Sequence, residues 1–169
     1  MKTAASIALF LWTPALAAAQ AAGPPLHGDC SHPIELTLNR EYVCAESPSG
    51  PGGRQEFNGN RGSIHLFPSE INTVWYRFLA PADGSVIFEI HPFRPEDDYD
   101  WMLFRQTGAD HCDSILNYGV KPLRTNRARN DLGMEGRTGL DEGYENLQAP
   151  PGPGLSYSKP LTVKRGDIY

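Results

Sequence analysis

Short stretches in which apolar and polar residues alternate recur along the chain and predict β-strands. Residues 34–38 and 161–164 alternate with a period of two. Residues 73–80 are the most β-rich stretch, because β-branched and aromatic residues dominate it. Beyond the first 21 residues, no stretch keeps the apolar spacing of a helix over three turns. The pattern therefore predicts many short strands and little helix.

The stretch 73–80 is followed by Pro-Ala-Asp-Gly at 81–84, which is a turn signature, and then by a second β-rich stretch at 85–90. This order predicts an antiparallel hairpin. Aromatic strands require burial, so we expect Trp75 and Phe88 to lie in one core between two facing β-layers. The expected inward face of the second strand consists of Val86, Phe88 and Ile90.

Acidic residues collect at 96–100, directly before an aromatic strand that begins at Trp101. Asp98 and Asp100 alternate onto one face of this strand, and Asp97 precedes them. Calcium takes six to eight oxygen ligands from such groups. We therefore expect calcium as a cofactor, with Asp97, Asp98 and Asp100 as ligands. Two alternatives are a solvated acidic loop and pairing of these carboxylates with arginines.

Two long segments, 47–62 and 117–154, lack apolar runs and are expected to form loops. The second holds Arg124, Asn126 and Arg129, which we take as candidate binding residues for a glycan or protein ligand. The alternative is a polar network in which these arginines and asparagines fix the loop to the acidic strand.

Composition agrees with strands and loops, because 17 glycines and 15 prolines occur among 169 residues. The fold class that we predict is all-β, a jelly-roll-like antiparallel β-sandwich. The last two residues, Ile168 and Tyr169, begin a further β-rich run, so we expect the sandwich to be incomplete at its C-terminus. The chain carries 20 acidic against 15 basic residues, which argues against nucleic acid as a partner.

Residues 1–21 have the features of a signal peptide: Lys2, a short apolar run and small residues near the end. Residues 22–169 would then form one domain, without a membrane-spanning segment, in the periplasm, on the outer-membrane surface or outside the cell. Export permits a disulfide. Spacing favours Cys30–Cys44, and pairs with Cys112 stay open.

Several motifs occur in an order that resembles a known group of domains. They include Asp29-Cys30, Asn72-Thr73-Val74-Trp75-Tyr76, Asp97-Asp98-Tyr99-Asp100-Trp101 and Val163-Lys164-Arg165-Gly166-Asp167. This order resembles exported β-sandwich domains of Bacteroidetes-type bacteria, which are similar to pre-peptidase C-terminal and CUB-like jelly rolls. The resemblance implies a sandwich fold within a larger surface protein.

These observations predict a non-catalytic binding or scaffolding module of a secreted or cell-envelope protein, stabilised by calcium, with a role such as adhesion. No Gly-x-Ser-x-Gly or His-Glu-x-x-His motif occurs, so we do not expect an enzyme. The alternative is an accessory domain of a secreted peptidase or glycosidase whose catalytic part lies outside this chain.

Overall fold

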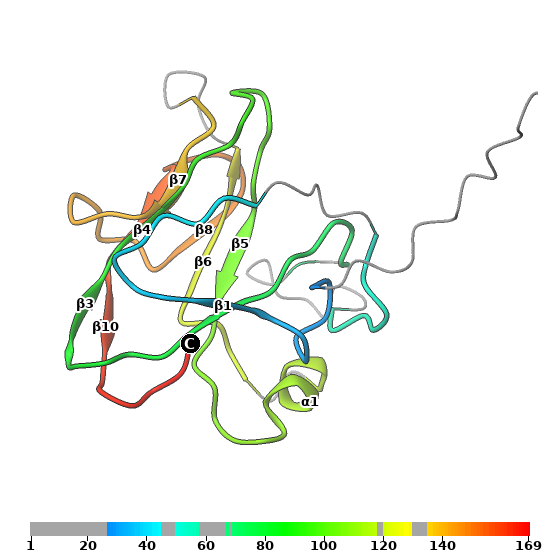
Figure 1. Ribbon diagram of the computed structural model, residues 1–169. Coiled ribbons are helices and arrows are strands. Elements are labelled where there is room, and N and C mark those ends of the chain that lie inside the picture. The colour runs from blue at the N-terminus through cyan, green and yellow to red at the C-terminus, as the bar shows by residue number, and fades with distance from the viewer. Residues whose placement is uncertain (1–26, 45–49, 58–66, 68, 118–119, 130–134) are drawn as a thin grey trace, which may run out of the picture.

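A computed structural model describes residues 27–44, 50–57, 67, 69–117, 120–129 and 135–169 (Figure 1). The predicted signal peptide at 1–21 lies outside the described residues. The strands are β1 (Ile34–Leu36), β2 (Tyr76–Phe78), β3 (Gly84–Val86), β4 (Phe88–Ile90), β5 (Trp101–Leu103), β6 (Arg124–Arg129), β7 (Thr138–Leu140), β8 (Gln148–Pro153), β9 (Tyr157–Ser158) and β10 (Leu161–Val163). One short helix, α1 (His111–Leu116), lies among them.

The prediction of an all-β fold is confirmed. The described strands form sheets with the orders β1-β2, β10-β3, β4-β7-β9 and β5-β6-β8. The pairs β3–β10, β4–β7 and β5–β6 are antiparallel, whereas β1–β2, β6–β8 and β7–β9 are parallel. No helix in the described part of the chain is long and apolar enough to cross a membrane.

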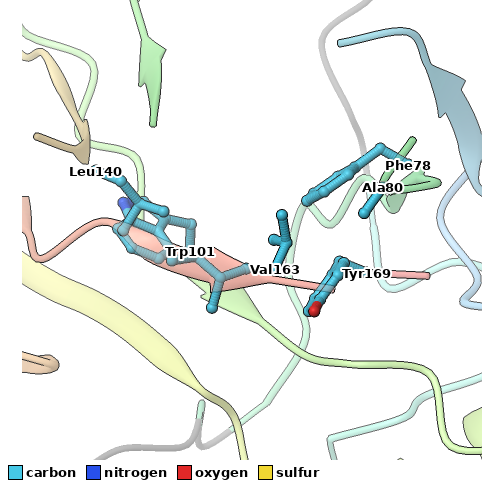
Figure 2. Close-up of a cluster of buried hydrophobic side chains, with 7 residues drawn as sticks. Phe78, Ala80, Trp101, Leu140, Val163 and Tyr169 are labelled. Atoms are coloured by element: carbon cyan, nitrogen blue, oxygen red, sulfur yellow. The ribbon is translucent and has the colours of Figure 1, made fainter. Parts of the chain in front are cut away.

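The main hydrophobic core lies between these sheets. Trp101 of β5 and Leu140 of β7 lie at one end of the cluster, and Phe78 stacks on Tyr169 at the other, with ring centroids 5.3 Å apart (Figure 2). Burying each large side chain stabilises the fold by about 1.5–3 kcal/mol. Val86, Phe88 and Ile90 pack against this core, which confirms their predicted inward face.

A second, smaller core forms around Cys30, Phe57, Phe104 and Ile115, of which Ile115 belongs to α1. Trp75 packs against this second core and Phe88 against the main one, so the expectation that they share a core is wrong. The reason is alternation along the extended chain, because Trp75, directly before β2, and Phe78, within β2, point to opposite faces.

The predicted hairpin of residues 73–80 and 85–90 is not formed. β2 pairs with β1, and its continuation pairs with the C-terminal segment, where Phe78 and Tyr169 exchange two backbone hydrogen bonds. β3 pairs instead with β10. The link at 81–84 carries the chain from one sheet to another, and the Asp83 carboxylate accepts a hydrogen bond from the Arg165 backbone N–H.

The segment 117–154, predicted to be a loop, contains β6, β7 and β8. β6 lies between β5 and β8, and its Thr125 and Asn126 are fully buried. The Asn126 side chain donates a hydrogen bond to the Leu155 carbonyl and accepts one from the Ala128 N–H. Because these hydrogen bonds compensate for burial, a polar sequence forms a central strand here.

Candidate functional site

Two adjoining hollows lie at the end of β5 and share Arg105 and Leu123. Their volumes are about 430 Å³ and about 390 Å³, within the range of small-ligand sites. We call them together the basic groove. Thr107, Ser114, Val120 and Lys121 complete the first hollow. Arg124, Leu161, Thr162, Lys164, Asp167 and Tyr169 complete the second.

Pairing of three distant segments builds the basic groove. The backbone N–H of Leu123 donates to the Leu103 carbonyl over 2.8 Å, which aligns the start of β6 with the end of β5. The N–H of Gln106 donates to the Ile168 carbonyl over 2.8 Å, which brings the C-terminal segment alongside. Phe104 points into the second core and its neighbour Arg105 is exposed, as strand alternation requires.

The lining of the basic groove is positive although the chain has a net charge of −5. Four cationic side chains line it, against one carboxylate, Asp167. Arg105 Nη1 lies 3.5 Å from Asp167 Oδ2, and Arg105 is about half exposed, so this pair is weak. Neither Lys121 nor Lys164 has an ion-pair partner among the described residues.

Arg124 serves mainly as a structural clamp at the wall of the basic groove. Its guanidinium donates hydrogen bonds to the backbone carbonyls of Leu123, Lys159 and Pro160, at 2.7–2.9 Å. Burial lowers the pKa of Arg124. These bonds hold the link before β10 against the start of β6 and leave the charge of Arg124 in the groove wall.

The structure does not gather the three predicted binding residues into one site. Arg124 lines the basic groove, whereas Asn126 is buried beneath the surface and 1% exposed. Arg129 is exposed at the far end of β6 and lines neither hollow. Of the three, only Arg124 therefore belongs to the groove.

The acidic residues before β5 lie near arginines. Asp97 accepts a hydrogen bond from Arg94 at 2.8 Å, and Asp100 Oδ2 lies 3.8 Å from Arg127 Nε. Burial, followed by the charge of Asp98, raises the pKa of Asp100. Within the described ranges no three His, Cys, Asp or Glu side chains are placed to hold one metal ion. Calcium binding by Asp97, Asp98 and Asp100 stays a prediction.

The disulfide joins Cys30 to Cys112, with Cα atoms 5.7 Å apart, so the favoured Cys30–Cys44 pairing is wrong. The turn at Cys30 is brought to α1 because the N–H of Trp75 donates to the His27 carbonyl, and Trp75 packs in the second core. Cys44 instead lies beside Tyr76, with which it hydrogen-bonds. Short sequence spacing was misleading because the fold brings distant segments together.

Sequence reasoning missed a pair of buried carboxyl groups, Glu56 and Glu70, which are 0% and 3% exposed. Burial, followed by the charge of Glu56, raises the pKa of Glu70 to about 7. Burial is also the main cause that raises the pKa of Glu56. Both lie outside any apolar periodic stretch, so no sequence signal distinguishes them from exposed glutamates.

No family model matches the chain, and no solved structure matches it significantly. The chain is similar to a protein of avian hepatitis E virus described as pro-secreted protein ORF2, with 28% identity over 109 residues. The match covers 62% of this chain and 18% of the viral protein.

Proposed function

We propose that this chain is a non-catalytic binding module of an exported protein and that the basic groove holds an acidic saccharide. The observation that carries the proposal is the convergence of Arg105, Lys121 and Lys164 around open hollows on an acidic protein. The positive lining attracts anions, whereas the remaining acidic surface of the chain repels them, so an anionic ligand is directed to the groove. The disulfide is compatible with an extracellular location.

The chemistry of the groove lining favours a sugar over a simple anion. Hydroxyl groups of Thr107, Ser114 and Thr162 stand beside the cations and can exchange hydrogen bonds with sugar hydroxyls. Leu123 and Val120 add apolar surface for the carbon face of a ring. Adjoining hollows suit consecutive units of a chain that carries carboxylate or sulfate groups.

The test is binding of the purified chain to heparin and polygalacturonate, with neutral dextran as the comparison. The double variant Lys121→Glu/Lys164→Glu is expected to weaken binding to the acidic polymers by tenfold or more, on the order of 1.4 kcal/mol. Added salt is expected to weaken wild-type binding, because salt screens exposed charges. Isothermal titration calorimetry measures both effects.

The matched control is Arg40→Glu/Arg129→Glu, which makes the same change in charge at exposed positions outside the groove. It is expected to retain most of the affinity. Equal losses in the two double variants would show attraction by overall charge alone and would overturn the groove assignment. Absence of binding to both acidic polymers would overturn the proposed function.

A further inference from the structure

The buried pair Glu56 and Glu70 uses only one oxygen of each carboxyl group for backbone contacts. Glu56 Oε1 accepts from the Cys30 N–H at 3.1 Å. Glu70 Oε2 accepts from the N–H groups of Glu56 and Phe57, at 2.5 Å and 3.3 Å. These bonds tie the segment 50–57 to Glu70 on one side and to the disulfide-bonded Cys30 on the other.

The second oxygens, Glu56 Oε2 and Glu70 Oε1, are buried and have no N–H or O–H donor among the described residues. The two side chains are nevertheless within hydrogen-bonding reach of each other. The charged group that faces Glu56 is another carboxylate, Asp29, and no cation forms an ion pair with Glu56 or Glu70 in the described chain. Two ionised carboxylates cannot share such a site without a large cost.

We propose that Glu56 and Glu70 share one proton and form a pH-sensitive latch that closes the segment 50–57 over the second core. One of the two unpartnered oxygens carries the proton and donates it to the other, which accepts, so that a single O–H···O bond gives both oxygens a partner. The latch is thus a buried proton-binding site, comparable in chemistry to other carboxyl pairs that hold a single proton between them.

The latch lies against the aromatic side chains of the second core. Phe57 follows Glu56 directly and stacks on Trp75 and Phe104, with ring centroids 6.1 Å and 6.2 Å apart. The disulfide partner Cys30 is 8% exposed in the same core. Loss of the shared proton leaves two buried negative charges near Asp29, so the segment separates and exposes the disulfide.

The direction in which closure of the latch depends on pH follows from the raised pKa of Glu70. The folded state holds the proton more tightly than the unfolded state. The latch therefore stabilises the closed segment in full at pH values below the ordinary glutamate pKa of about 4.3. This stabilisation is lost as the pH rises through the pKa of Glu70, about 7. The equilibrium constant for opening of the segment therefore increases at neutral to alkaline pH, by up to tenfold for each pH unit above this value.

The test measures reduction of Cys30–Cys112 by a phosphine in the full chain, followed by alkylation and mass spectrometry. Rates are divided by those of the urea-unfolded chain at the same pH, which removes the pH dependence of the reagent. We expect the normalised rate to rise about tenfold between about pH 6 and about pH 8. In Glu70→Gln the amide donates to Glu56 without ionising, so the rate should be low and independent of pH.

Glu56→Gln is the reciprocal variant and should show the same low, pH-independent rate as Glu70→Gln. If either of these two variants does not fold, the other still decides the test. Exposed Glu142→Gln is the control and should keep the wild-type pH dependence. A pH-independent wild type, or an unchanged pH dependence in both buried variants, would overturn the latch. Protection by calcium that disappears in both variants would instead assign the pair to a metal ion and also overturn it.

Discussion

Replacing Cys30 and Cys112 together by alanine is expected to lower the free energy of unfolding by about 4.5 kcal/mol. The bridge joins residues separated by 82 positions, so its removal restores much conformational entropy to the unfolded chain. The second core depends on the bridge as well, because the bridge ties the turn at Cys30 to α1. Urea unfolding followed by tryptophan fluorescence measures the loss as a shift of the transition midpoint.

Cys44→Ala is the control for this experiment, because Cys44 lies outside the bridge and near the surface. Its replacement removes a thiol hydrogen bond to Tyr76 and should cost about 1 kcal/mol or less. A loss for Cys44→Ala as large as that for the double variant would contradict the Cys30–Cys112 pairing.

The features that the sequence predicts well are those that depend on local alternation. The inward face of Val86, Phe88 and Ile90 follows directly from a period of two, and it holds although the strand breaks at Ile87. β10, with Leu161 and Val163 buried and Thr162 exposed, follows from the same rule. In each case one apolar face decides the structure without reference to a distant partner.

The features that the sequence does not predict depend on which distant segments meet. β6 is polar in sequence and reads as a loop, yet its buried Asn126 finds partners at Leu155 and Ala128. β2 pairs with β1 and the C-terminal segment because of the whole sheet arrangement, which the turn at 81–84 does not encode. Hydrogen-bond compensation and strand pairing are properties of the folded chain.

The same distinction applies to the candidate site. Arg124 was identifiable as one of several arginines in a polar stretch, and it does line the basic groove. Arg105 and Lys164 become its neighbours only because Gln106 pairs with Ile168, which lies 62 positions further along the chain. A cluster built in this way has no spacing signature that sequence analysis could recognise.

Gly139→Ala is expected to destabilise the protein by about 3 kcal/mol or more, since backbone strain and steric overlap add together. Gly139 has a φ of +149° in the middle of β7, between β4 and β9. A Cβ atom placed there would lie 2.0 Å from the Phe88 carbonyl oxygen and 2.9 Å from its carbonyl carbon. Thermal and urea unfolding of the variant measure the change.

The overlap at Gly139 cannot be relieved by a rotamer change, because the atoms that it meets belong to the backbone of the paired strand β4. Moving β4 would also shift Phe88, whose ring packs edge-on against Trp101 with centroids 5.1 Å apart. Gly84→Ala at the start of β3 is the matched control, with no atom within 4 Å of the added Cβ. It should change stability by no more than about 1 kcal/mol. Similar effects of the two substitutions would contradict the close approach of β7 to β4 that defines this side of the main core.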